Sequence, residues 1–239
     1  MIHQRSISAS ISITLISLLT ACLPSVGWAQ RNKPVKPAKG AAAKVAAKDS
    51  VALFRGFAVS VDLIGPLQLM VSDYGQYEAA VRLNLKDKYF PIVELGYGKG
   101  EHDDGVTFLH YKTSAPYVKI GIDFNVLKNK HDIYRLYAGA RYAFTSFKYD
   151  LYHPDITDPV WGGTAHYEAR DIKSNYHWFE AVFGVDAKIW GPVHLGWSIR
   201  YRSRLSYKQS TYGDPWYVPG FGKSDSSNLG GTFNVSLDI

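Results

Sequence analysis

Residues 179–201 read FEAVFGVDAKIWGPVHLGWSIRY. Apolar side chains occupy every second position in both arms of this stretch, and charged, polar or glycine residues occupy most positions between them. Alternation over roughly ten residues is typical of a β-strand whose two faces meet different surroundings. The segment Trp190-Gly191-Pro192 between the arms has the composition of a tight turn. The stretch therefore predicts a β-hairpin with one continuous apolar face, which we interpret as part of a membrane-spanning barrel.

The same alternation recurs along the chain and predicts eight strands. These cover residues 57–63, 77–85, 93–98, 118–126, 136–145, 179–189, 193–201 and 233–239. Short connections (86–89, 128–132 and 190–192) alternate strictly with long ones (64–75, 99–115, 150–174 and 206–228). Bacterial outer-membrane barrels have short periplasmic turns and long outer loops. The predicted fold is therefore all-β: an eight-stranded antiparallel up-and-down transmembrane β-barrel, with its first strand paired to its last.

The polar faces of these strands carry acidic and basic residues in equal number. A Lys or Arg that faces lipid at mid-depth costs roughly 2–4 kcal/mol, so this face is expected to point inward. We predict a polar network inside the barrel that holds it rigid. A soluble barrel with an apolar interior is the alternative. The predicted network consists of Asp62, Glu78, Arg82, Glu94, Lys119, Asp123, Arg141, Glu180, Asp186, Lys188, Arg200 and Arg202.

Aromatic residues gather near both ends of the predicted strands, which indicates two interfacial girdles. The turn-end girdle comprises Tyr89, Phe90, Tyr134 and Trp190, and the loop-end girdle comprises Tyr97, Tyr117, Tyr149, Tyr176 and Trp178.

The chain divides into three predicted parts. Residues 1–29 have the basic start, apolar core and small-residue cleavage site of a secretory signal peptide. An alternative is a lipoprotein signal, because Leu19-Thr20-Ala21-Cys22 resembles a lipobox. Residues 30–50 form a disordered basic Lys/Pro/Ala linker, and residues 51–239 form the barrel. The basic excess lies before residue 51, so no nucleic-acid surface is expected.

Four segments carry a resemblance to known proteins: SDYGQYE at 72–78, YFPIVELGYG at 89–98, KNKHDIYR at 128–135 and WGP at 190–192. With these, residues 54–239 resemble small outer-membrane barrels of the OmpA/OmpX type. They are closer still to an uncharacterised domain-of-unknown-function family of Gram-negative envelope proteins. The resemblance implies the whole barrel and no activity. One departure is the final residue, Ile239, where such barrels usually end in an aromatic.

We assign no catalytic, cofactor or metal site from the sequence. His194 and Ser198 share a face, as a lipid-modifying hydrolase could use them, but they lie near the turn end and on the polar side. The long connection 99–115 contains His102, Asp103, Asp104 and His110 without the spacing of a defined metal loop. A lipid- or glycan-modifying enzyme therefore remains an alternative function.

The third and fourth long connections are rich in aromatic residues that could contact a surface partner. The candidates are Tyr152, Trp161, Tyr167, Tyr212, Trp216, Tyr217 and Phe221. We expect an outer-membrane protein with a structural or surface-interaction role. Its N-terminus and linker would be periplasmic and its long loops extracellular. Its partners would be outer-membrane lipid, the barrel-insertion machinery and an unidentified extracellular ligand.

Overall fold

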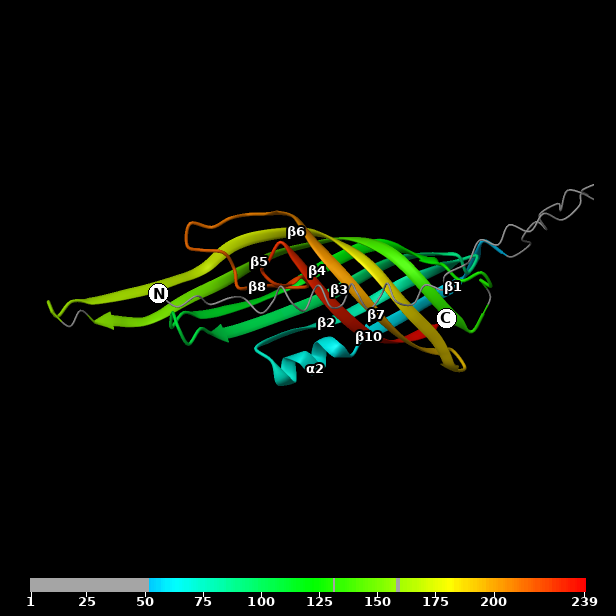
Figure 1. Ribbon diagram of the computed structural model, residues 1–239, viewed down its shortest axis with the longest axis horizontal. Helices are drawn as coiled ribbons and strands as arrows, with labels where there is room; N and C mark the ends of the chain where they lie inside the picture. The colour runs from blue at the N-terminus through cyan, green and yellow to red at the C-terminus, as the bar shows by residue number, and fades with distance from the viewer. Residues whose placement is uncertain (1–51, 131, 158–159) are drawn as a thin grey trace, which may run out of the picture. The chain divides into compact units, whose positions relative to one another are not determined.

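The computed structural model describes residues 52–130, 132–157 and 160–239, so the predicted signal peptide and linker lie outside the described residues. Within this part, eight antiparallel strands close into a barrel in the order β1-β10-β7-β6-β5-β4-β3-β2 (Figure 1). The barrel strands are β1 (Phe54–Asp62), β2 (Tyr74–Leu85), β3 (Tyr89–Asp103), β4 (His110–Asn125), β5 (Tyr134–Thr157), β6 (Thr164–Trp190), β7 (Val193–Tyr207) and β10 (Ser227–Asp238). The predicted fold class is confirmed.

The barrel closes between its first and last strands, as a membrane barrel requires. β1 pairs with β10 from Ala58↔Asp238 to Asp62↔Asn234. The β6–β7 hairpin has the register that its alternation predicts, with Glu180 opposite Arg202 and Phe183 opposite Ile199.

The middle of the barrel is apolar outside and polar inside. On β6, Phe183 is 48% exposed, whereas Glu180 is completely buried. On β7, Trp197 is 50% exposed, whereas Arg200 is 2% exposed. The alternative of a barrel with an apolar interior is therefore wrong, and this is the inside-out arrangement of a transmembrane barrel.

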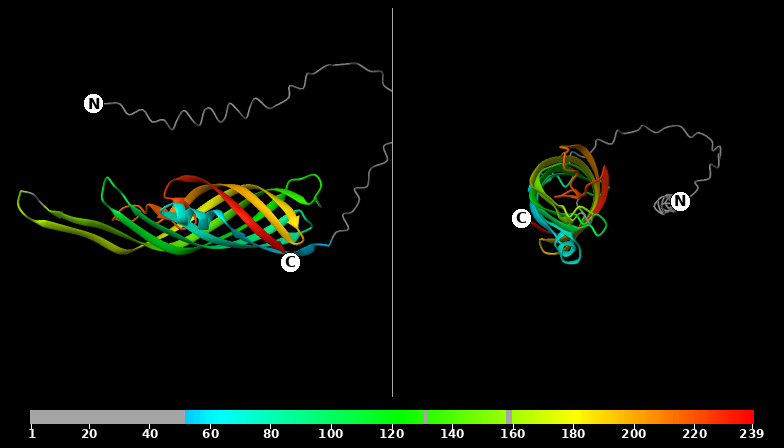
Figure 2. Two further views of the ribbon diagram at one scale, coloured as in Figure 1. Left: turned by 90° about the horizontal axis from the view of Figure 1, so that it is seen from below. Right: turned by 90° about the vertical axis from the view of Figure 1, so that its left-hand side faces the viewer.

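Two of the long connections are strand for most of their length. β3 and β4 extend through the predicted loop 99–115 and leave only 104–109 between them. β5 and β6 extend to Thr157 and Thr164, and their hairpin projects far beyond the other strands (Figures 1 and 2). Alternation did not predict strands here because these segments do not carry aliphatic residues at every second position.

The other two long connections carry local structure of their own. The first contains helix α2 (Ile64–Val71), which lies outside the barrel wall beside β2 and β10 (Figure 1). The last contains a small hairpin of β8 (Tyr217–Val218) and β9 (Gly222–Lys223). Among the described residues, no helix is both long enough and apolar enough to cross a bilayer.

Candidate functional site

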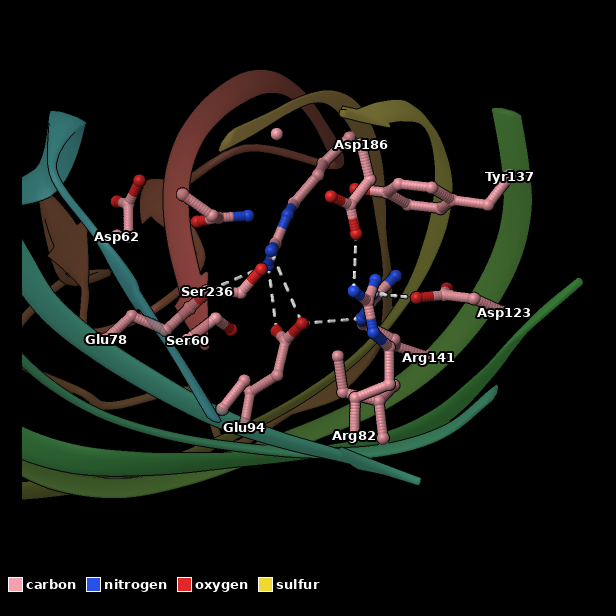
Figure 3. A pocket seen from close by; sticks show the side chains of 15 residues that line it. Ser60, Asp62, Glu78, Arg82, Glu94, Asp123, Tyr137, Arg141, Asp186 and Ser236 are labelled. Atoms are coloured by element: carbon pink, nitrogen blue, oxygen red, sulfur yellow. Dashed lines mark hydrogen bonds and ion pairs between the residues drawn. The ribbon is translucent and has the colours of Figure 1, made fainter. Parts of the chain in front are cut away.

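The middle of the barrel is filled by ion pairs that cross it from wall to wall. Glu94 on β3 accepts hydrogen bonds from Arg200 Nη1 on β7 at 2.8 Å and from Arg141 Nε on β5 at 2.7 Å. Arg141 Nη2 also donates to Asp123 on β4 at 3.0 Å. Figure 3 shows Glu94, Arg141 and Asp123 pointing toward one another. Glu94 and Arg200 come from β3 and β7, which lie four strands apart in the ring, so their contact links distant parts of the wall.

A second group of charges surrounds Lys119. Its Nζ lies 2.9 Å from Glu78 and 3.1 Å from Glu180, and its side chain is completely buried. Glu180 also accepts hydrogen bonds from Arg202 Nε at 3.2 Å and from Trp178 Nε1 at 2.8 Å. Buried charges are tolerated only when they are paired, and Lys119, Glu78 and Glu180 each lie close to at least two groups of opposite charge.

A third group lies toward the turn end. Arg82 donates to Asp186 at 2.5 Å, and Arg135 donates to Asp238 at 3.0 Å. His194 joins the two acids: its Nδ1 lies 3.2 Å from Asp186 and its Nε2 lies 3.1 Å from Asp238. The space lined by Arg82, Glu94 and their neighbours measures only about 30 Å³, which is room for about one water molecule (Figure 3).

Most of the predicted network residues form these interior ion pairs; Asp62 lines the same interior space but binds backbone groups, and Lys188 lies outside it. Asp62 accepts hydrogen bonds from the backbone N–H groups of Ile64, Gly65 and Phe233, so it anchors α2 to β10. Lys188 is exposed at the turn end, where a bulge displaces the end of β6. The residues that meet inside are Glu78, Arg82, Glu94, Lys119, Asp123, Arg141, Glu180, Asp186, Arg200 and Arg202.

Sequence reasoning missed three contributors to the interior. Asp238 lies on the polar side of the last predicted strand but was not part of the predicted interior network. Arg135 precedes the predicted start of its strand by one residue. His194 was absent from the predicted network, although a structural contact with Asp186 or Lys188 in the neighbouring strand was preferred to a catalytic pair with Ser198. Ser198 Oγ lies 2.8 Å from Thr232 Oγ1, and His194 contacts carboxylates.

The loop end of the barrel is closed by the β8–β9 hairpin, which folds into the ring (Figure 2). Tyr217 and Phe221 are buried there, at 1% and 0% exposed, so the prediction that they are surface contacts is wrong. The Tyr217 carbonyl accepts a hydrogen bond from Tyr111 Oη at 2.6 Å, and Arg202 Nη1 donates to the Phe221 carbonyl at 2.9 Å. The turn needs Gly220, whose φ is +83° and whose missing Cβ would lie 2.5 Å from the Tyr117 ring.

The predicted loop-end girdle is largely wrong for the same reason. Tyr117, Tyr176 and Trp178 face inward and pack against this hairpin, and Tyr149 faces inward and donates a hydrogen bond to the Gly213 carbonyl, while Tyr97 remains exposed. At the turn end, Tyr89, Tyr134 and Trp190 are exposed as predicted, whereas Phe90 is buried beneath Arg82. Alternation itself puts these aromatics on the inward face, since Tyr117 precedes the inward Lys119 by two residues and Trp178 precedes the inward Glu180 by two; their place near strand ends was the misleading signal.

The remaining predicted surface aromatics are exposed, except one. Trp161 is 87% exposed at the tip of the β5–β6 hairpin, Tyr212 is 58% exposed, and Tyr152 and Tyr167 are 39% and 38% exposed. Trp216 is half-buried and stacks on His102 with ring centroids 4.1 Å apart. The exposed aromatics of the third connection therefore lie on the projecting hairpin.

Comparison with known proteins gives a family. Residues 8–238 match the family model described as domain of unknown function (DUF6048). The chain belongs to this family. Two solved structures are similar to this DUF6048 chain. They are Neisserial surface protein A (TM-score 0.43, 12% identity, 78% of this chain and 99% of that one) and the attachment invasion locus protein Ail of Yersinia pestis in complex with the heparin analogue sucrose octasulfate (TM-score 0.36, 10% identity, 77% and 93%). No curated protein matches.

The histidine-rich connection of this DUF6048 protein holds its side chains in separate local contacts. His102 Nδ1 lies 2.8 Å from Asp73, His110 contacts Asp103, and Asp104 accepts hydrogen bonds from Val106 N and Thr107 Oγ1 within its own turn. Within residues 52–130, 132–157 and 160–239, no group of three or more His, Cys, Asp or Glu side chains is arranged to hold a metal ion.

Proposed function

We propose that this protein is a non-enzymatic outer-membrane barrel that mounts the β5–β6 hairpin rigidly at the cell surface for contact with an extracellular partner. The observation that carries the proposal is the combination of a filled interior with one hairpin that projects beyond the barrel. In this model the N-terminus and the linker are periplasmic, the hairpin is extracellular, and the barrel-insertion machinery delivers the chain to the membrane.

The outer surface supports a membrane location. Outward residues along the strands are apolar and exposed, for example Leu95 (61%), Ile120 (59%) and Ile199 (45%). Exposed apolar surface on this scale is unfavourable in water and favourable against acyl chains. Among the described residues, the ten interior charges named above face away from this surface.

The filled interior argues against a transport role. Lys119, Glu94 and Arg200 cross the lumen at its middle, and the β8–β9 hairpin covers its loop end. An eight-stranded barrel is just wide enough for its own side chains to fill it. The buried His194 and Ser198 have structural partners, so we assign them no role in catalysis.

The projecting hairpin has the features of a contact surface. Its tip presents Trp161, and its β6 arm from residue 164 to 174 has no described strand beside it on the β7 side, since that pairing starts at Tyr176↔Tyr207. Exposed aromatics and unpaired strand edges are both common means of binding a partner.

The orientation is tested by labelling intact cells with a membrane-impermeant maleimide. The variant Trp161→Cys should be labelled in intact cells, and the matched variant Lys128→Cys, in an exposed short turn at the opposite end, should be labelled only after the outer membrane is permeabilised. The parent chain gives the background from Cys22. Labelling of Lys128→Cys alone in intact cells would mean that the barrel is inverted.

Membrane insertion itself is tested by fractionation and by gel electrophoresis with and without boiling. The protein should be found in the outer-membrane fraction and should migrate faster before boiling than after it. Recovery from the aqueous periplasmic fraction without detergent contradicts the proposal.

A further inference from the structure

The barrel wall is incomplete near the loop end, beside β1. β1 ends at Asp62, opposite Asn234. β10 continues from Phe233 back to Ser227 and is paired there with β7 alone. β2 likewise begins at Tyr74 and, as far as Glu78, is paired with β3 alone. Within the described residues, no strand lies between these two edges.

Helix α2 covers only one side of this gap. It packs directly against β2, because a Cβ on Gly75 would lie 2.6 Å from the Leu69 side chain and 2.8 Å from the Gly65 carbonyl. Asp62 holds the start of the helix and also accepts a hydrogen bond from Phe233 N at 3.1 Å. A slot of about 480 Å³ remains between α2 and β10, which is within the usual size range of ligand sites.

The slot has an apolar outer part and a polar inner part. Leu67, Val71 and Leu229 line the outside, and each is more than half exposed. Gln76, Arg202 and Asn228 line the inside. The Arg202 Nε and Nη1 groups bind Glu180 and the Phe221 carbonyl, and the guanidinium lies about 3.2 Å from where a Gly230 Cβ would be, so it faces the slot.

The outer part of the slot continues the surface that the barrel presents to lipid. Leu237, Phe233 and Leu229 follow one another along the outer face of β10 and lead into the slot. Backbone groups at unpaired strand edges are costly in hydrocarbon unless something covers them. The occupant that fits this surface is a molecule already in the membrane, with a long apolar part and hydrogen-bonding oxygens at one end.

We propose that the slot binds one membrane lipid, with an acyl chain between α2 and β10 and headgroup oxygens at Arg202, Gln76 and Asn228. This inference rests on the membrane location given under the proposed function. It adds a ligand site in the barrel wall that is separate from the projecting hairpin.

Native mass spectrometry of the full chain, purified from outer membranes in mild detergent, tests the site. The expected spectrum contains a species heavier by the mass of one membrane lipid. The variant Gly231→Phe places a ring at the slot, where the nearest atom to a Cβ is Ser198 O at 3.6 Å, so the backbone can accept the substitution. Its lipid occupancy should fall about tenfold, the effect of losing about two buried methylenes. Leu237→Phe, on the same outer face and away from the slot, should keep the lipid.

Leu67→Asp provides a second variant if Gly231→Phe does not fold. Leu67 is 60% exposed, so the change should leave the barrel intact and put a carboxylate where the chain lies. Equal lipid occupancy in the parent and both slot variants would mean that the lipid is adventitious and would overturn the inference. A membrane-inserted, heat-modifiable parent without bound lipid also overturns it, whereas a parent found in the aqueous fraction overturns the membrane location itself.

Discussion

Lys119→Met tests whether the interior ion pairs stabilise the barrel. The Lys119 side chain is completely buried, and its Nζ lies 2.9 Å from Glu78 and 3.1 Å from Glu180. Unit charges ~3 Å apart attract by roughly 5 kcal/mol at an effective dielectric constant of ~20, and desolvation of the ions offsets much of this. Removing one partner of a buried pair costs about 3–5 kcal/mol. We expect the free energy of unfolding to fall by about 3 kcal/mol, at the lower end of that range. The loss is limited because Glu78 still pairs with Arg200 and Glu180 still pairs with Arg202.

The assay is denaturant unfolding of the detergent-solubilised barrel followed by tryptophan fluorescence, with the gel shift as a check that each variant folds. Lys148→Met is the matched control: its ion pair with Asp171 is exposed, so its removal should leave the midpoint unchanged. Glu180→Gln also removes the carboxylate that pairs with Arg202, so the double variant Lys119→Met/Glu180→Gln should be destabilised by less than the sum of the two single variants, with a coupling energy of about 2 kcal/mol. A destabilisation below about 1 kcal/mol for the single variant, or purely additive effects in the double variant, would refute the reasoning.

Three further predictions concern the β8–β9 hairpin that closes the loop end, the projecting β5–β6 hairpin and the packing of the lumen. Phe221→Ala should lower the free energy of unfolding by about 3–5 kcal/mol, because a fully buried ring is lost; a change below about 1 kcal/mol would mean that this segment does not seal the barrel. His166 donates hydrogen bonds to Asp155, which has the larger effect, and to Glu168, and these bonds raise the pKa of His166. Its charged contacts are therefore present at low pH and are lost as the pH rises through that raised pKa. Asp155→Asn should move the pKa down in an NMR titration, and an unchanged value contradicts the contact. Gly184→Ala would place a Cβ 2.6 Å from the Tyr137 ring and should cost about 1–3 kcal/mol in the same unfolding assay, whereas a neutral result would show that the ring is free to move.

The strands could be predicted from the sequence because alternation reports directly on a wall with two unlike surroundings. The β6–β7 hairpin shows this, since Phe183 and Glu180 differ in exposure as their positions in the pattern require. The balance of acids and bases on the inner face likewise predicted that the charges would pair. Which acid pairs with which base was not predictable, because the partners come from strands far apart in the chain, such as Glu78 and Arg200.

The errors arose where the chain leaves the membrane-spanning part of the wall. Tyr217 and Phe221 have the composition of an exposed binding loop, yet they fold into the lumen because its loop end is lined with aromatics rather than charges. Tyr117 and Trp178 provide that lining from β4 and β6. Alternation places both on the inner face, but the prediction took them as girdle residues from their place near strand ends. The position of each residue in the alternating pattern predicted which face it occupies better than its type or its place near a strand end did.

Two sets of contacts close the barrel: the ion-pair network and the packing around the β8–β9 hairpin. Arg202 and Glu180 link these two sets. Arg202 binds Glu180 in the ion-pair network through Nε and binds the Phe221 carbonyl in the closing hairpin through Nη1. Glu180 in turn accepts a hydrogen bond from Trp178, which packs on Phe221 at a centroid distance of 5.8 Å. Opening the loop end therefore requires breaking contacts of buried charges, which is strongly unfavourable. It follows that a pore is not a readily reached state of this barrel, and that binding is to be sought on the projecting hairpin and at the slot beside α2.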